Sequence, residues 1–404
     1  MALQVKKFGG SSVASPEKIR SIAERVLAQK AEDDRIVIVV SAMGDSTDEM
    51  MNLARQCTHR AYGRELDMLL TTGEQVSIAL LAMTFMELGH PAISLTGPQA
   101  GIQTDRSYGK GRILSIHPNR VFEALDEGNI VIVAGFQGVA DNGDLITLGR
   151  GGSDTTAVAL AGALQADVCE IFTDVEGVYS ADPRVVTNAF KMQEITYGEM
   201  LEMARLGAGV MQPRAVETGS RYHLPIHVRS TFVDTIGTMI QEEYTMEGQA
   251  NKICGVAHDT NVTKVAVLGV DNRPGMAHMI FDCLSKAGID VDMIVQSIRE
   301  SDDSRTDIVF TISETDLPQA KEALSELIEN EDMNNILFNS NVAKISVVGA
   351  GMLGTPGVAA RMFGALGIAG INIQIISTSE ISISCLIDQD DVERAVACIH
   401  DTFM

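Results

Sequence analysis

One stretch of the chain reads Leu145-Ile-Thr-Leu-Gly-Arg-Gly-Gly-Ser-Asp-Thr-Thr-Ala-Val-Ala-Leu-Ala-Gly-Ala-Leu164. It begins like the end of an apolar strand and ends like a buried helix rich in Ala and Leu. Three glycines and Arg150 lie between, and Ser153 and Asp154 are typical first residues of a helix. Glycines let the backbone approach a ligand, and a helix N-terminus favours a phosphate or carboxylate. The stretch therefore predicts an anion-binding strand, loop and helix; an ordinary turn before a capped helix is the alternative.

The same order of strand, glycine loop and helix is predicted at the N-terminus. Val5 begins a strand that ends in Lys7-Phe-Gly-Gly-Ser-Ser12. A Walker P-loop carries its lysine after the glycines, whereas Lys7 precedes them, so the segment is not a P-loop. The continuous apolar run Arg35-Ile-Val-Ile-Val-Val-Ser41 follows and is typical of a parallel strand buried on both faces.

Further strands and helices alternate along this part of the chain. We predict strands at 92–95, 129–136, 166–174 and 224–230, and helices at 66–87 and 199–220. Alternation of this kind indicates an α/β fold, with a parallel-rich central sheet sandwiched by helices. Binding sites in such folds gather at the carboxyl ends of the strands, where Lys7, Ser41, Gly135 and Asp174 stand.

Composition limits the classes of protein to consider. At 404 residues, of which 45% are hydrophobic, the chain is long enough for two or three domains with sizeable cores. Its formal charge of −23 argues against binding to nucleic acid or to an anionic membrane. The six cysteines form no C-x-x-C pair, and the eight histidines stand singly, so we expect reduced thiols and no protein metal site.

The N-terminus lacks the apolar region of a signal peptide, and no run of 18 apolar residues occurs. We therefore expect a soluble, cytoplasmic protein.

The last third of the chain contains an internal repeat. Thr263-Lys-Val-Ala-Val-Leu-Gly-Val270 matches Ala343-Lys-Ile-Ser-Val-Val-Gly-Ala350, and Ala287-Gly-Ile-Asp-Val-Asp-Met-Ile294 matches Ala369-Gly-Ile-Asn-Ile-Gln-Ile-Ile376. Each copy reads strand, helix, strand, strand, helix, which indicates a small α+β module. The literal G-x-G-x-x-G at 349–354 suggests a dinucleotide site, but too few strands follow it, so we assign it to the loop of the module.

Domain boundaries follow from composition and from counting strands. We place the first domain at 1–235, a polar linker at 236–251 and the first module at 263–341. That module has a closing strand, Asn335–Asn339, whereas the second module has none after its last helix. An unpaired sheet edge is normally covered or paired. We therefore predict that 252–258 pairs with the sheet of 342–404, so that the first module is inserted in the second.

Seven motifs now stand in order along the chain: Lys7-Phe-Gly-Gly-Ser-Ser12, Ser41-Ala-Met-Gly-Asp-Ser-Thr47, Thr72-Gly-Glu74, Gly135-Phe-Gln-Gly138, Gly149-Arg-Gly-Gly-Ser-Asp154, Thr173-Asp174 and Tyr179-Ser-Ala-Asp-Pro-Arg184. Together they resemble the motifs of the aspartate kinases, which belong to the amino acid kinase family. The paired repeats resemble the ferredoxin-like ACT modules with which that family senses amino acids. The resemblance covers nearly the whole chain and implies the amino acid kinase fold.

The resemblance also implies a reaction, the transfer of the ATP γ-phosphoryl group to the side-chain carboxylate of L-aspartate. Its catalytic residues would be Lys7, Asp154 and Ser41, with Lys7 neutralising the transferring group and Asp154 orienting Lys7 or Ser41. The substrate-binding residues would be Thr47, Glu74, Gly135, Arg150, Gly151 and Ser153. Arg150 would form two hydrogen bonds with the aspartate α-carboxylate, and Glu74 would accept a hydrogen bond from the aspartate ammonium group.

For the nucleotide, the implied contacts are Lys7, Gly9, Gly10, Thr173, Asp174, Tyr179, Asp182 and Arg184. The cofactors would be ATP and Mg²⁺, with the metal held mainly by phosphates and water. Some members of the family carry a lysine where this chain has Gly209, which leaves the ATP contacts of that segment open.

Feedback by lysine, threonine or both is a further implication. Effectors would bind near Asp271, Pro274, Gly275, Ala277, Asp292, Gln296, Met352, Thr355, Val358, Asn372, Ile373, Ser379 and Glu380. We expect a homo-oligomer formed through the ACT modules, and some relatives add a regulatory subunit from an internal start, for which Met246 is a candidate. Because the chain ends at Met404, we expect no fused homoserine dehydrogenase.

Two other readings remain: another amino acid kinase of the same fold, acting on glutamate, carbamate or a nucleotide, and a non-catalytic amino-acid sensor. The tandem modules and the combination of Glu74 with Arg150 argue against the first. The presence of Lys7, Arg150 and Asp154 together argues against the second.

Overall fold

The computed structural model describes residues 2–244, 253–298, 305–330, 335–352 and 355–404. The chain forms two compact units. The first comprises Met1–Val178, Lys191–Ala204 and Gly209–Glu247, and the second comprises Tyr179–Phe190, Arg205–Ala208 and Gly248–Met404.

An eight-stranded sheet is the centre of the first unit, with the order β10-β12-β11-β9-β1-β2-β6-β3. Its strands are β1 (Leu3–Phe8), β2 (Arg35–Val40), β3 (Ala92–Leu95), β6 (Ile130–Ala134), β9 (Val168–Thr173), β10 (Glu194–Thr196), β11 (Ile226–Ser230) and β12 (Thr238–Gln241). All neighbours run parallel except β11 and β12. The predicted parallel-rich sheet is confirmed. Because β2 and β6 are covered on both faces, they are almost continuously apolar and buried.

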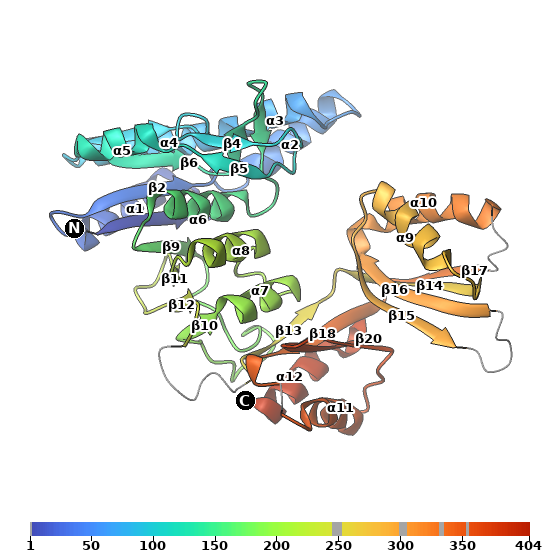
Figure 1. Cartoon of the computed structure of the whole chain (residues 1–404). Coiled ribbons are helices and arrows are strands. Elements are labelled where there is room, and N and C mark those ends of the chain that lie inside the picture. The colour runs from blue at the N-terminus through green and yellow to red at the C-terminus, as the bar shows by residue number, and fades with distance from the viewer. Residues whose placement is uncertain (1, 245–252, 299–304, 331–334, 353–354) are drawn as a thin grey trace. The chain divides into compact units, whose positions relative to one another are not determined.

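Helices cover both faces of this sheet (Figure 1). The α-helices of this unit are α1 (Pro16–Gln29), α2 (Ser46–Cys57), α3 (Arg64–Leu70), α4 (Thr72–Glu87), α5 (Asn119–Asp126), α6 (Gly152–Leu164), α7 (Tyr197–Arg205) and α8 (Pro213–Tyr222). On one face, α1 and α4 pack on a core that includes Phe8, Ile38 and Ile132. On the other face lies α6, whose Asp154 contacts Lys7, the neighbour of Phe8 on β1.

Two of the predicted helices are each divided in the structure. The helix predicted at 66–87 is α3 and α4, which meet at Thr71. The helix predicted at 199–220 is α7 and α8, because Gly207 adopts a φ of +110° and Pro213 begins a new helix after the extended Gln212.

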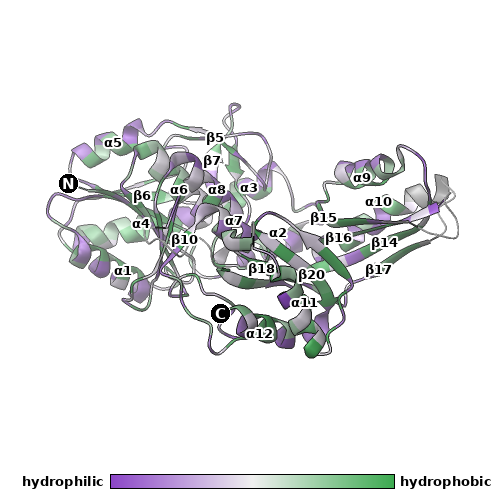
Figure 2. Ribbon diagram, turned by 60° about the horizontal axis from the view of Figure 1, so that its bottom comes forward, coloured by the Kyte–Doolittle hydropathy of each residue, from purple (hydrophilic) through white to green (hydrophobic). Residues whose placement is uncertain are grey.

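The segment Arg64–Glu87 is long and apolar enough to cross a membrane by length and composition alone, and half of its most apolar window is buried. Hydrophobic residues run along α4 (Figure 2). Ile78, Leu81 and Phe85 pack in the core between α1, α4 and the large sheet. Its apolar character therefore matches its place as a core helix.

A small sheet leads to the predicted glycine loop. It has the order β5-β4-β7-β8, with β4 (Ile102–Thr104), β5 (Ile113–Ile116), β7 (Gln137–Val139) and β8 (Leu145–Thr147). The chain leaves β8, passes through the loop at Gly149–Gly151 and enters α6.

The second unit contains two antiparallel four-stranded sheets with the orders β15-β16-β14-β17 and β13-β18-β20-β19. Its strands are β13 (Gly255–Asp259), β14 (Val262–Asp271), β15 (Val291–Ile298), β16 (Arg305–Ser313), β17 (Asn335–Asn339), β18 (Val342–Val348), β19 (Ile375–Thr378) and β20 (Ser382–Asp388). Its α-helices are α9 (Met276–Lys286), α10 (Leu317–Asn330), α11 (Val358–Ile368) and α12 (Val392–Phe403).

Strand β13 precedes the first of these sheets in the chain but belongs to the second. It pairs antiparallel with β18, from Gly255 opposite Val348 to Asp259 opposite Lys344. The predicted linker at 236–251 must be shortened, because β12 occupies part of it and pairs with β10 and β11. The rest of that linker from residue 245, together with Met246, Lys252 and residues 353–354 of the glycine motif, lies outside the described residues.

Candidate active site

A cavity of about 480 Å³ lies in the first unit, at the carboxyl ends of β1 and β2 and the start of α6. Most residues assigned to catalysis and substrate binding line it: Lys7, Ser41, Thr47, Glu74, Arg150, Gly151, Ser153 and Asp154. Gly9 and Gly10, which were assigned to the nucleotide, line it as well. Residues from separate parts of the chain meet there because parallel strands bring their carboxyl ends to one edge of a sheet.

Lys7 and Asp154 form an ion pair at the wall of the cavity. The Lys7 Nζ lies 2.6 Å from the Asp154 Oδ1, and the two side chains are 11% and 12% exposed. This Oδ1 accepts no aligned hydrogen bond within the described part of the chain. Partial removal from water strengthens the attraction between the two charges. The pair thus holds an ammonium group at the end of β1, where it can neutralise an incoming anion.

Ser41 and Ser153 connect the end of β2 to the first turn of α6. The Ser41 hydroxyl donates to the Ser153 Oγ at 2.9 Å. Gly135 does not line the cavity but leaves room for this contact, since a Cβ there would lie 2.6 Å from the Ser153 Oγ. Two hydroxyl groups are therefore presented to the cavity from neighbouring elements.

Glu74 lies in the first turn of α4 and is 2% exposed. Its Oε1 accepts from the Ala42 N–H at 3.2 Å, whereas its Oε2 has no partner among the described residues. Burial raises the pKa of Glu74 to about 7, although backbone hydrogen bonds act to lower it. A buried carboxylate with one unused oxygen is suited to a cationic group that enters the cavity.

The loop after β8 presents Arg150. Gly149 and Gly151 adopt left-handed conformations with φ of +75° and +66°, and a Cβ on Gly151 would overlap the Gln212 side chain. Arg150 is exposed and makes no ion pair with any described residue. A guanidinium group at the rim of the cavity can form two parallel hydrogen bonds with a carboxylate.

Several cavity residues were not predicted from the sequence: Met51, Leu66, Asp67, Leu70, Gly109 and Thr147. For Asp67 a signal was present. It precedes Glu74 by seven residues and thus lies on the same helical face as Leu70 and Glu74, a position where a lone acid among leucines is unusual. The other residues have no chemical signature of their own in the sequence.

The expected nucleotide contacts fall in both units. Thr173 and Asp174 lie at the end of β9 in the first unit, and the Thr173 hydroxyl donates to Asp174 at 3.0 Å. Tyr179, Asp182 and Arg184 belong to Tyr179–Phe190 of the second unit and do not line the cavity. The Arg184 guanidinium donates to both Asp182 oxygens and lowers the pKa of that carboxyl.

The segment Tyr179–Phe190 is packed within the second unit. Ala181 and Val186 join the hydrophobic core of the β13-β18-β20-β19 sheet. The Ser180 Oγ lies 2.9 Å from the His400 Nε2 of α12, and the Val256 N–H donates to the Ser180 carbonyl at 2.7 Å. Contacts so distant in sequence could not be read from local patterns.

The expected effector residues lie in the loops, strands and first helical turns of the two modules. Three of them are already engaged within the protein. The Asp292 carboxylate lies 2.7 Å from the Lys344 Nζ, and Val358 is buried in the core of the second module. Ser379 shares a hydrogen bond of 2.8 Å with the Ser382 hydroxyl.

Equivalent residues of the repeat hold the two modules together. While Lys344 pairs with Asp292, the corresponding Lys264 donates to the corresponding Gln374 at 2.5 Å. The repeat therefore produces two equivalent contacts in which a lysine of one module reaches the other module, once to a carboxylate and once to an uncharged amide.

Within the described residues, no group of three His, Cys, Asp or Glu side chains is placed to hold a metal ion.

Comparisons with known proteins concern the family and the fold of the chain. A model of the amino acid kinase family matches residues 2–230, and an ACT domain model matches 265–327 and again 345–403. An aspartokinase of Mycolicibacterium smegmatis is 48% identical over 407 residues, covering 100% of this chain and 96% of the relative. One of Geobacillus stearothermophilus is 49% identical over 403 residues, covering 100% of this chain and 97% of the relative.

Among solved structures, the E. coli aspartokinase III in complex with aspartate and ADP (R-state) is similar. Its TM-score is 0.83 and its sequence identity is 25%, with 99% of each chain covered.

Proposed function

This chain belongs to the amino acid kinase family as an aspartokinase, and we propose that it transfers the ATP γ-phosphoryl group to the side-chain carboxylate of L-aspartate, giving 4-phospho-L-aspartate and ADP. The observation that carries the proposal is the cavity that joins Lys7, Glu74 and Arg150. It offers one cation for a phosphoryl group, one acceptor for an ammonium group and one guanidinium for a carboxylate.

The substrate binds through its backbone groups. Arg150 forms two hydrogen bonds with the α-carboxylate, and the free Oε2 of Glu74 accepts from the ammonium group. Ser41, Thr47 and Ser153 complete the polar wall, and Gly151 lets the loop approach closely. The side-chain carboxylate then points toward Lys7 and attacks the γ-phosphorus, while the bond to the β-phosphate oxygen breaks.

Lys7 stabilises the transferring group, because its positive charge lies where negative charge spreads over the phosphoryl oxygens. The amides of Gly9 and Gly10 add donors at the same place. Asp154 holds the ammonium in position through the contact of 2.6 Å. No protein nucleophile is needed for this reaction.

The nucleotide is ATP, for which we propose contacts from Thr173, Asp174, Tyr179, Asp182 and Arg184. When bound with the nucleotide, Mg²⁺ would neutralise part of the phosphate charge. Asp154, which lines the cavity beside Lys7, is a carboxylate that would accept a hydrogen bond from a water of the bound ion. The E. coli aspartokinase III bound aspartate and ADP, which supports the same pair of ligands here.

Regulation and assembly form part of the same proposal. The two ACT matches support feedback by lysine, threonine or both at the effector residues named above, and homo-oligomers built through the ACT modules. We place the enzyme in the cytoplasm. A regulatory subunit made from an internal start is a further element of the proposal.

A coupled assay of ADP release tests the activity, with ATP and aspartate as substrates and glutamate as the control. Arg150→Ala should raise the KM for aspartate by about 100-fold. Arg150→Lys should raise the KM for aspartate less than Arg150→Ala does, but still above the wild-type value. Lysine keeps the positive charge but cannot form two parallel hydrogen bonds with the carboxylate. Equal rates with glutamate and aspartate, or no ADP release with aspartate, would overturn the proposed reaction.

A further inference from the structure

Asp67 on α3 is a buried carboxylate at the edge of the active-site cavity, and the reaction outlined above gives it no part. It is 1% exposed and forms no ion pair with a described Lys or Arg. Burying a carboxylate without a cation is costly unless hydrogen bonds replace its water. The reason for its position must therefore lie in the groups that donate to it.

The donors come from two segments that converge on the arginine loop. Thr147, the last residue of β8, donates from its backbone N–H at 3.0 Å and from its hydroxyl at 2.9 Å. The Gly109 N–H donates to both carboxylate oxygens, at 3.1 and 3.0 Å. Both oxygens are thus used, and none of the donors is a charged side chain.

These donors control the conformation of the loop. Thr147 precedes Gly149 by two residues and Arg150 by three. The Gly111 N–H donates to the Thr147 carbonyl at 2.8 Å, and the Gly109 carbonyl lies 3.0 Å from where a Cβ of Gly149 would be. Asp67 therefore holds both the strand that enters the loop and the turn that packs against it.

A second link joins α3 to Asp144, the residue before β8, and lies farther along the chain from the arginine loop. The Arg64 Nε donates to Asp144 at 2.7 Å, and the Tyr108 hydroxyl donates to Asp144 at 2.8 Å. Arg64 is half exposed, so this link stays in contact with water. Substitution of Asp144 therefore provides a control. It removes a contact of α3 with the segment before β8 but leaves the hydrogen bonds between Asp67 and Thr147 in place.

We propose that Asp67 is a positioning residue for substrate recognition, which holds the loop at Gly149–Gly151 so that the Arg150 guanidinium meets the α-carboxylate of the amino acid. The inference rests on the proposed role of Arg150 in binding aspartate. A carboxylate suits this task because it accepts several N–H and O–H donors at once and donates none. The amide of Asn would turn at least one of these contacts into donor against donor.

Steady-state kinetics of the full-length protein with ATP and aspartate test the proposal. Asp67→Asn should raise the KM for aspartate about tenfold, as expected for one unsatisfied buried contact, and change kcat and the KM for ATP by less than about threefold. Thr147→Val should act in the same direction, and Thr147→Ser should restore wild-type kinetics because it keeps the hydroxyl. Asp144→Asn should leave the KM for aspartate within about twofold of the wild type.

The outcomes separate this inference from the proposed function. If the wild type fails to phosphorylate aspartate, the proposed function is wrong. If the wild type is active but Thr147→Val and Thr147→Ser behave alike, or Asp144→Asn raises the KM as much as Asp67→Asn, the positioning role is wrong. The Thr147 pair decides the question even if Asp67→Asn does not fold, which circular dichroism would reveal.

Discussion

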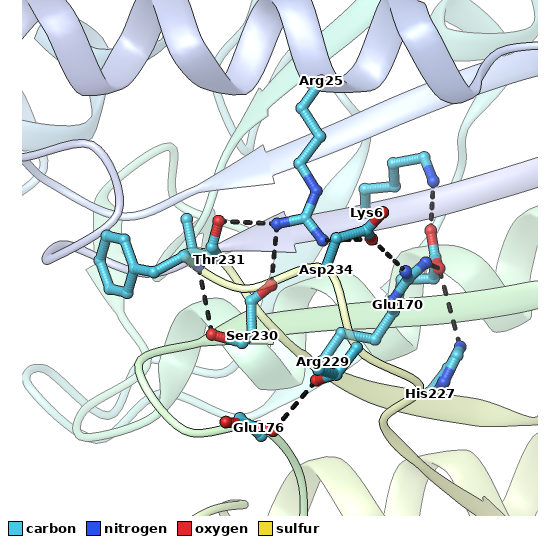
Figure 3. A network of polar contacts seen from close by, with 11 residues as sticks. Lys6, Arg25, Glu170, Glu176, His227, Arg229, Ser230, Thr231 and Asp234 are labelled. Carbon is cyan, nitrogen blue, oxygen red and sulfur yellow. Dashed lines mark hydrogen bonds and ion pairs between the residues drawn. The ribbon is translucent and has the colours of Figure 1, made fainter.

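Lys6 and Glu170 face each other across the neighbouring strands β1 and β9, and their side chains, 3% and 8% exposed, form a buried ion pair. Side chains alternate along a strand, so Lys6 lies on the opposite face of the sheet from the active-site Lys7. Figure 3 shows that Arg229 and His227 also reach Glu170. Two adjacent lysines thus serve different purposes, one in the core of the fold and one at the cavity.

Lys6→Met should lower the free energy of unfolding by about 3 kcal/mol, the lower end for breaking a buried pair, since Arg229 still contacts Glu170 at 2.9 Å. Arg20→Met, which breaks the exposed pair with Glu24, is the control and should cost less than about 0.5 kcal/mol. Urea unfolding followed by circular dichroism measures both. Equal losses for the two variants would contradict the structural role of Lys6.

The same pair predicts a dependence of stability on acid. Burial acts to raise the pKa of Glu170, but Lys6 and Arg229 more than offset this effect, so its pKa lies below the ordinary value of 4.5. A carboxyl whose pKa is lowered by folding stabilises the protein above its unfolded pKa. That stability is lost as the pH falls below 4.5, and Glu170→Gln should remove this part of the acid sensitivity in urea unfolding between pH 3 and pH 6.

Lys7→Ala should lower kcat by at least about 100-fold while the KM for aspartate changes little, because the charge matters most in the transition state. The thermal unfolding midpoint should be measured alongside, since Asp154 loses its partner. A folded Lys7→Ala protein with a turnover near that of the wild type would show that the ammonium has another role.

Glu74 should release a proton when aspartate binds. With a pKa of about 7, it is partly protonated in the free enzyme at neutral pH, and a substrate ammonium beside it would favour the charged form. The KM for aspartate should therefore fall as the pH rises through about 7, and this dependence should disappear in Glu74→Gln. Calorimetry at pH 7 in buffers of different ionisation enthalpy measures the proton directly; identical binding heats would count against the assignment.

Glu380→Ala should relieve inhibition by lysine or threonine and leave the uninhibited rate unchanged. The expected increase in inhibitory concentration is about 5- to 150-fold, the usual range of coupling between an effector site and an active site. Ser379→Ala should act in the same direction, although its hydrogen bond with Ser382 means that its unfolding midpoint must be compared as well. Activity that stays flat up to high millimolar lysine plus threonine would remove the idea of feedback.

Amide exchange tests the unusual place of β13. The N–H of Cys254 donates to the Val348 carbonyl, and that of Val256 to the Ser180 carbonyl. Exchange at Cys254 and Val256 should therefore be as slow as at Ile345–Val348. Cleavage near Asn341 should not release two stable modules. The second module includes β13, which precedes the first module in the chain and would stay attached to it after the cut. Fast exchange at Cys254 would contradict the pairing of β13 with β18 in solution.

Local patterns in the sequence were sufficient for the features that depend on neighbouring residues. The apolar run at 35–41 predicted a buried parallel strand, and the glycines beside Lys7 and Arg150 predicted loops at strand ends. Because all parallel strands of one sheet end at the same edge, placing Lys7, Ser41 and Asp154 near one cavity required little more than the order of the elements. The repeat likewise revealed two modules, since its period is visible in the sequence itself.

The tertiary structure alone decided contacts between residues far apart in the chain. Asp67 receives its hydrogen bonds from partners 42 and 80 residues away, and Ser180 meets His400 across 220 residues. Such partners leave no period or motif in the sequence. Any residue that the fold brings to the right point could supply the same hydrogen bond, whatever its distance along the chain. The assignment of Tyr179–Phe190 to the second unit and the strand at Thr238–Gln241 have the same origin: each depends on which surface lies beside the segment after folding.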